Sequence, residues 1–220
     1  ILPPYDGKAF SSFVETIYNM HGYIEHCREE YVLISQGNVI TNIDYTDVFD
    51  FHSKKKADIT LIYKNHAIPQ GYDRPITLDV DNDGKVNQIF VKPGVVDKGV
   101  FNHAYGSILI KKDLLMSEIR NAISVNQLDV RRLIQSSLGK YSIYAYENKG
   151  YCAAISSIND YFEFNMDLMK KEVRDELFNP QRPIYTKVRD DAPSRYGLTS
   201  NVKNSIIAQG CVINLSLIHI

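Results

Sequence analysis

Apolar, β-branched segments alternate with helical patterns in the first part of the chain, and this alternation constrains the fold most. Residues 31–35 are typical of a strand, 45–56 of a helix, and 59–63 of a second strand. The helix has acidic residues early and three lysines at its end, as the helix dipole favours. Strands that alternate with helices favour a parallel sheet covered by helices, so we expect an α/β fold.

The flanking segments extend this pattern. A helical spacing of apolar residues runs from about Phe10 to Cys27. Residues 76–80 and 86–91 flank a polar turn and predict an antiparallel hairpin. Its aspartates copy the first half of a calcium-binding loop, but the twelfth position, which needs glutamate, is Phe90. We expect further strands over 106–110, 141–146 and 150–154, and helices over 112–123, 128–138 and 157–171.

The C-terminal part has a different character. Prolines beyond residue 180 predict an extended linker, and from Val202 to Ile213 apolar pairs recur about every six residues. That period is typical of a parallel β-helix. We therefore expect an α/β domain over 1–180, a linker over 181–201 and the first coils of a truncated β-helix over 202–214. Residues 215–220 match the translation of a sequencing adaptor, so we expect them to be non-native and the chain to be a fragment.

Composition excludes several classes of protein. A formal net charge of −1 over 220 residues provides no excess of positive charge for binding nucleic acid or an anionic membrane. No apolar run approaches the ~20 residues that span a bilayer, and no export leader is recognisable. The three cysteines are scattered and odd in number, which favours a reducing cytoplasm over a disulfide framework.

A small polar turn, Gln36-Gly37-Asn38, follows the first predicted strand. In open α/β sheets the carboxyl end of a strand is where ligands bind, so this turn is a candidate site. Lys92 follows another apolar strand and is long enough to reach a phosphate, although a solvated loop lysine is the simpler interpretation. The histidines at 52, 66 and 103 have no neighbouring ligand pattern, so packing or surface roles are expected for them.

Taken together, these segments resemble the bacterial glucose-1-phosphate adenylyltransferases of glycogen synthesis, over nearly the whole chain to about Ile213. The residues that carry the resemblance are Glu30–Ile40, Ile43–Tyr45, Ala57–Thr60, Lys92-Pro93, Ala104–Gly106, Ile158–Leu168, Pro183–Thr186 and Asn204–Ile213. The resemblance implies a Rossmann-like nucleotidyltransferase domain, truncated before its first strand and phosphate loop, followed by a left-handed parallel β-helix.

The resemblance also implies a reaction, in which glucose 1-phosphate attacks the α-phosphorus of ATP to give ADP-glucose and pyrophosphate. Catalytic members hold the required Mg²⁺ with two aspartates. By the family's motifs, the first aligns with Asn38 and the second with Ala154. Mg²⁺ prefers anionic oxygen ligands, whereas asparagine offers one neutral oxygen and alanine none.

The loss of both acids, with the surrounding motifs kept, indicates a chain freed from catalysis. The family contains such a branch, the non-catalytic regulatory D-type subunit. The sequence of Tyr185–Pro193 also resembles that branch. The resemblance then implies a cytoplasmic heterotetramer in which the catalytic partner, and not this chain, binds ATP and Mg²⁺. Residual sugar-phosphate binding is expected at Lys92, Gly37, Tyr105 and Gly106.

Two alternatives remain open from the sequence. In the first alternative, the chain is an active nucleotidyltransferase with relocated metal ligands, for which Asp44, Asp97 and Asp160 are the nearest candidates. In the second alternative, it is a stand-alone sugar-phosphate-binding module without a catalytic partner.

Overall fold

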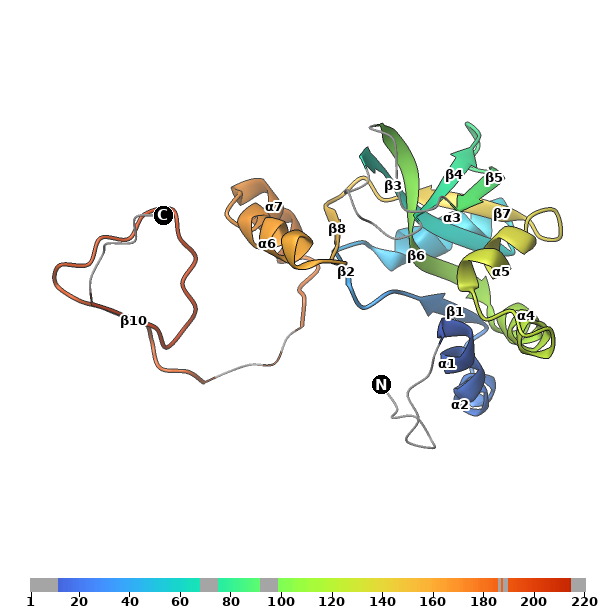
Figure 1. Cartoon of the computed structure of the whole chain (residues 1–220), viewed down its shortest axis with the longest axis horizontal. Helices are drawn as coiled ribbons and strands as arrows, with labels where there is room; N and C mark the ends of the chain where they lie inside the picture. The colour runs from blue at the N-terminus through green and yellow to red at the C-terminus, as the bar shows by residue number, and fades with distance from the viewer. Residues whose placement is uncertain (1–11, 68–74, 92–98, 186, 188–189, 215–220) are drawn as a thin grey trace. The chain divides into compact units, whose positions relative to one another are not determined.

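The fold is taken from a computed structural model, which describes residues 12–67, 75–91, 99–185, 187 and 190–214 (Figure 1). Predictions made for residues 1–11, for Lys92 and Asp97, and for 215–220 lie outside these ranges. The contacts divide the chain into two units, one up to Ala154 and one from Ile155 onward. The end of the first domain expected at residue 180 stays a prediction.

The first unit is built on a six-stranded sheet with the order β5-β4-β6-β3-β7, to which β1 is added along β6. Its strands are β1 (Tyr31–Ile34), β3 (Ile59–Ala67), β4 (Ile76–Val80), β5 (Val86–Val91), β6 (Val100–Lys111) and β7 (Ile143–Glu147). A separate antiparallel pair joins β2 (Val39–Thr41) to β8 (Cys152–Ala154). The hairpin β4–β5 confirms the turn predicted from its aspartates, since Asp81 Oδ1 accepts hydrogen bonds from the backbone N–H groups of Asp83 and Lys85.

The expectation of a parallel sheet is wrong. Strands β3 and β7 are parallel, but β6 runs antiparallel to β1, β3 and β4, so the sheet is mixed. The predicted strand–helix–strand unit exists, yet its two strands are not neighbours, because β6 lies between them. Periodicity identifies the strands but not the partner of each strand, which is decided by the packing of the whole sheet.

Helices cover the sheet of this unit. They are α1 (Phe13–Asn19), α2 (His21–His26), α3 (Tyr45–Lys55), α4 (Lys112–Ser124) and α5 (Val130–Ser136). The single helix expected over about 10–27 is thus two helices, because the backbone at Met20 (φ −91°, ψ 4°) leaves the helical range. Helix α3 begins and ends close to the predicted positions. Asp44 caps its first turn, and Lys56 at its C-cap has a left-handed backbone.

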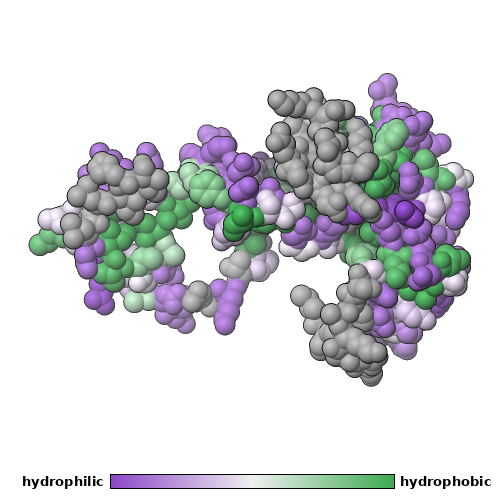
Figure 2. Space-filling model, in the orientation of Figure 1, coloured by the Kyte–Doolittle hydropathy of each residue, from purple (hydrophilic) through white to green (hydrophobic). Residues whose placement is uncertain are grey.

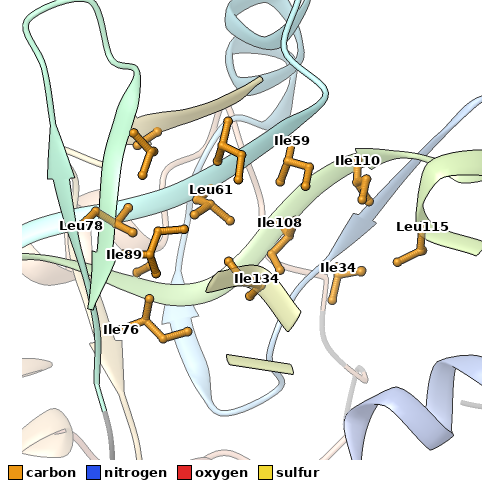
Figure 3. Close-up of a cluster of buried hydrophobic side chains, with 14 of the residues drawn as sticks. Ile34, Ile59, Leu61, Ile76, Leu78, Ile89, Ile108, Ile110, Leu115 and Ile134 are labelled. Atoms are coloured by element: carbon orange, nitrogen blue, oxygen red, sulfur yellow. The ribbon is translucent and has the colours of Figure 1, made fainter. Parts of the chain in front are cut away.

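The core lies between the sheet and the helices α1, α4 and α5, and Figure 3 shows its side chains directed into one space. Buried residues labelled there are Ile34, Ile59, Leu61, Ile76, Leu78, Ile89, Ile108, Ile110, Leu115 and Ile134. Burying each such side chain contributes about 1.5–3 kcal/mol. Since residues of β6 pack against side chains from β1, β3, β4 and α5, the core fixes β6 at the centre of the unit.

The second unit contains α6 (Ile158–Asp167), α7 (Lys171–Leu177), and the strands β9 (Arg195–Tyr196) and β10 (Val212–Ile213). The helix predicted over 157–171 therefore ends at Asp167. Strands β9 and β10 pair in parallel, two residues each. This short pairing does not establish the β-helix, which stays a prediction. Hydrophobic side chains are exposed on α6, and Figure 2 shows hydrophobic surface on both units.

Within the described ranges, no helix combines the length and the apolar character needed to cross a bilayer.

Candidate functional site

The site lies where the sheet forks along one edge of β6. The C-terminal half of β6 pairs with β1, so that Ile108 lies opposite Ile34. Its N-terminal half pairs on the same side with β4, so that Ala104 lies opposite Ile76. The residues of β6 between these two pairings border a space between β1 and β4. Such a fork provides an opening at a strand end without a break in the core beneath it.

A β-bulge occupies the fork. On the opposite edge of β6, Ile62 of β3 pairs with Ser107, whereas the next residue, Tyr63, pairs with Ala104. The register therefore skips two residues, Tyr105 and Gly106. Gly106 has φ +75°, a left-handed conformation that glycine adopts without strain. Bulges of this kind occur next to binding sites because they redirect side chains and end pairing.

The side chain of Gln36, from the turn after β1, lies directly over Gly106. A Cβ atom placed on Gly106 would come within 2.2 Å of Gln36 Nε2 and 2.7 Å of its Cδ. The turn itself is closed by a hydrogen bond from the Val39 N–H to the Gln36 carbonyl. The glycine thus serves two needs at once, the left-handed backbone of the bulge and the close approach of the Gln36 amide.

The fork opens into a cavity of about 360 Å³. Its polar side chains are Gln36, His103, Asp129 and Arg131, and its apolar lining residues include Phe13, Ile108 and Ile134. Ala104 and Gly106 complete the wall formed by β6. The volume falls within the roughly 300–1,000 Å³ of small-molecule sites, and the lining combines apolar side chains with convergent polar groups.

Behind this wall three rings pack together. His66 of β3 stacks on Tyr105 and on His103, with centroids 5.3 and 5.5 Å apart. His66 Nε2 hydrogen-bonds with the Tyr105 hydroxyl and lies 3.3 Å from His103 Nδ1. Burial lowers the pKa of His103 to about 3, and the neighbouring His66 contributes in the same direction. His103 is therefore neutral at pH 7, and it lines the cavity as an uncharged side chain.

The short ladder of β2 and β8 follows the Gln36 turn in the chain and is separate from the described lining of the cavity. Val39 lies opposite Ala154 in this ladder, so Asn38 is one residue away from the position that Ala154 faces. The Asn148 side chain donates to Thr41 Oγ1, which in turn donates to the Tyr151 carbonyl, and the Asn148 N–H donates to the Tyr63 carbonyl. These hydrogen bonds tie the ladder to β3. Two positions 116 residues apart in sequence, identified only from family motifs, are thus brought together.

The residues at these two positions do not fit a magnesium ion. Asn38 supplies one neutral oxygen and Ala154 supplies none, whereas Mg²⁺ is held through carboxylates. In the part of the chain that the structure describes, no group of three or more histidine, cysteine, aspartate or glutamate side chains could hold a metal ion. We therefore assign no catalytic step through a metal bound to these residues.

The relocated acids proposed from the sequence have structural roles. Asp44 Oδ1 accepts from the Thr46 N–H and caps α3. Asp160 forms a capping box with Ser157 at the start of α6. Burial would raise the pKa of Asp160, but hydrogen bonds from Ser156 and Ser157 lower it below its usual range. Asp97 lies outside the described residues. The two described candidates are thus accounted for by helix capping.

The predicted binding residues have different positions. Gly106 lines the cavity, Tyr105 is buried behind it, Gly37 lies in the exposed turn beside Gln36, and Lys92 is outside the described residues. Gln36 belongs to the turn expected from the sequence to be a candidate site, whereas His103, Asp129 and Arg131 were not expected as lining residues. His103 directly precedes the Ala104–Gly106 motif, and Asp129 and Arg131 begin a predicted helix, but only the fold brings them together.

The α/β architecture with its central mixed sheet fits a nucleotidyltransferase domain. No protein-family model matches the chain.

Comparison with known proteins identifies individual relatives of the chain. The chain is 27% identical over 191 residues to the glycogen biosynthesis protein GlgD of Bacillus subtilis (strain 168), covering 87% of this chain and 45% of that protein. It is 27% identical over 223 residues to the glucose-1-phosphate adenylyltransferase of Clostridium acetobutylicum, covering 97% of this chain and 57% of that enzyme. It is 29% identical over 230 residues to the glucose-1-phosphate adenylyltransferase of Ruminiclostridium cellulolyticum, covering 100% of this chain and 53% of that enzyme. The resemblance inferred from the sequence is confirmed, and the chain spans about half the length of these relatives.

Replacing Gly106 tests the geometry of the bulge. We expect Gly106→Ala to lower the free energy of unfolding by about 1–2 kcal/mol, the usual cost of a left-handed backbone for a residue with a Cβ. Contact with Gln36 adds to this loss, so a Gln36→Ala/Gly106→Ala double variant should lose less than the sum of the single variants. Urea unfolding measures all three. Gly22→Ala is the matched control, because Gly22 lies within α2 with nothing within 4 Å of an added Cβ. A Gly106→Ala variant no less stable than Gly22→Ala would contradict the geometry.

Proposed function

We propose that this chain is a regulatory, non-catalytic subunit of a glucose-1-phosphate adenylyltransferase in glycogen biosynthesis. The observation that carries the proposal is the double loss of acid at Asn38 and Ala154, two positions that the β2–β8 ladder brings together. The β2–β8 ladder and the hydrogen bonds that tie it to β3 are formed in this chain, which supports a change of charge at an intact site. GlgD, by its name a glycogen biosynthesis protein, and several adenylyltransferases among the relatives support the same pathway.

In this proposal the chemistry belongs to a partner. The catalytic subunit binds ATP and Mg²⁺ and joins glucose 1-phosphate to the α-phosphorus of ATP, with release of pyrophosphate. The present chain assembles with that subunit, as a cytoplasmic heterotetramer, and modulates it. Its β-helix segment, expected from Val202 onward, belongs to the same assembly. Residual sugar-phosphate binding at the fork is part of the proposal.

The two alternatives differ in what supports them. An active enzyme with relocated ligands needs acids at the site, but Asp44 and Asp160 cap helices. A stand-alone binding module would need only the cavity of about 360 Å³, and it differs from the proposal in having no catalytic partner. Assembly is therefore the property that separates a regulatory subunit from a binding module.

The test uses the full-length protein, expressed alone and together with a catalytic glucose-1-phosphate adenylyltransferase from the same source. We expect a stable complex by size-exclusion chromatography with light scattering, and a changed rate of ADP-glucose synthesis relative to the catalytic subunit alone. Substantial synthesis by the isolated chain would overturn the proposal. Failure of the two proteins to associate would favour the stand-alone binding module.

A further inference from the structure

Helix α3 covers the face of the sheet opposite the main core. Along β3, Leu61 belongs to that core, whereas the next residue, Ile62, clusters with Val48 of α3 and Leu109 of β6 on the second face. The residues of α3 that are buried are Val48 and His52. The attachment of this helix to the sheet therefore depends in large part on a side chain that can take up a proton.

His52 lies between the helix and the strands β1 and β3, and it is 1% exposed. Its Nδ1 lies 2.8 Å from Oγ1 of Thr60, a fully buried residue of β3. Its ring packs edge-to-face with that of Tyr31 on β1, with ring centroids 5.4 Å apart. Among the described residues, none forms a hydrogen bond with the buried Nε2 of His52. The surroundings thus satisfy one of the two ring nitrogens.

This geometry suits the neutral ring and not the charged one. With its proton on Nδ1, the neutral ring donates to Thr60 Oγ1, and Nε2 keeps a lone pair. Protonation turns Nε2 into a second donor, for which the described residues offer no acceptor. A buried donor without an acceptor is costly, and more so when it carries a charge. The docked helix therefore favours the neutral form of His52.

The charges around His52 act in the same sense overall. Lys111, at the end of β6, repels a protonated ring, whereas Asp58, just before β3, attracts it. Tyr31 on β1 is uncharged at pH 7. Burial is the largest effect, and together with Lys111 it outweighs Asp58, so the pKa of His52 is lowered from its ordinary value of 6.5.

We propose that His52 is a pH-sensitive switch, which holds α3 on the sheet while its ring is neutral and releases the helix when the ring is protonated. Release uncovers the apolar face formed by Ile62, Leu109 and Tyr146, while the main core on the other face stays closed. In the released helix His52 titrates near its ordinary value. The helix is therefore held above about pH 6.5, and its release increases by up to about tenfold for each pH unit below that value. The switch belongs to this chain alone and is independent of the proposed function.

Hydrogen exchange of the full-length chain, followed by mass spectrometry at about pH 7.5 and about pH 5.0, tests the switch. After correction for the intrinsic exchange rates, we expect the amides of α3 to be less protected than those of α4 at both pH values. On acidification they should lose at least about fivefold in protection, and His52→Gln, which takes up no proton, should reduce this loss to less than about twofold. His26→Gln is the matched control and should keep the full loss, because His26 also lies in the last turn of a helix, α2, but is exposed.

A second variant separates release of the helix from unfolding of the whole unit. Release of α3 leaves His103 buried, so the acid loss of protection in α3 should persist in His103→Asn. Amides of α3 that are as protected as those of α4 at both pH values would overturn the inference, since the helix would then open only with the whole unit. This comparison needs no variant. An acid loss that His52→Gln leaves unchanged, or that His103→Asn removes, would also overturn it.

Discussion

Aspartate introduced at both Asn38 and Ala154 is expected to raise Mg²⁺-dependent ADP-glucose synthesis by the full-length chain at least about a hundredfold, the scale on which one preorganised electrostatic group acts in an active site. The reason is geometric, because the β2–β8 ladder already brings the two positions together. Two carboxylates there would supply the anionic oxygens that Mg²⁺ requires. Steady-state assays of the isolated chain across a range of Mg²⁺ concentrations measure the gain.

Three controls make this result specific. Each single substitution should give far less than the pair, since one carboxylate does not make a two-ligand site. Asn87→Asp with Asn121→Asp adds the same two charges at exposed positions of β5 and α4, and should give no gain. A double Asn38/Ala154 variant that neither binds Mg²⁺ nor gains activity would show that these positions are not the lapsed metal ligands.

Acidification is expected to destabilise the first unit through His103. Its pKa is about 3 in the folded chain, below the ordinary value of 6.5, because burial disfavours the charged ring. The unfolded chain therefore takes up a proton as the pH falls below about 6.5, whereas the folded chain does not do so until about pH 3. The contribution of His103 to the free energy of unfolding is fully present above the pKa of the unfolded chain. Below that pKa it falls by about 1.4 kcal/mol for each pH unit. We expect a loss of about 2 kcal/mol between about pH 7.5 and pH 5.0.

The measurement is the free energy of unfolding in urea at both pH values, for the unsubstituted chain and for His103→Asn. The variant should be less stable at about pH 7.5 but should lose less on acidification. His52, buried on α3, also has a lowered pKa, with burial as the main cause, so some pH dependence should remain. Ile108→Val is the matched core control, expected to lower stability by about 0.5–1.5 kcal/mol at both pH values. An equal acid loss in His103→Asn would exclude His103 as the cause.

Local elements of this fold follow from local signals. The α3 helix was predictable because an acidic cap precedes it and lysines end it, and the β4–β5 hairpin because apolar segments flank an Asp/Gly turn. The place of β6 was not predictable in this way. Its apolar residues indicate a strand, but its position between β1 and β3 depends on which side chains fill the core from both faces.

The candidate site was likewise predictable only in part. Family motifs pointed to Asn38 and Ala154, and the ladder brings these positions together. The cavity depends on contacts that no local pattern contains. Gln36 meets Gly106 from 70 residues away in sequence, and Arg131 enters from a helix on another segment. Chemistry that is shared with relatives can be read from a motif, whereas the residues that replace it must be found in three dimensions.

The size of the bulge in β6 has a consequence for how a site can be inserted into a sheet. The strand gains two residues over β3 between Ile62 and Tyr63, and side chains of a strand alternate with a period of two. An even insertion leaves the alternation of the two strands in phase, so the residues of β6 before and after the bulge still point to their original faces. An insertion of one residue would have turned half of β6 over, exchanging the side chains of Ile108 and Ile110 with those of the opposite face, where Leu109 packs against Val48 of α3. The two-residue bulge thus opens the edge of the sheet while preserving both of its faces.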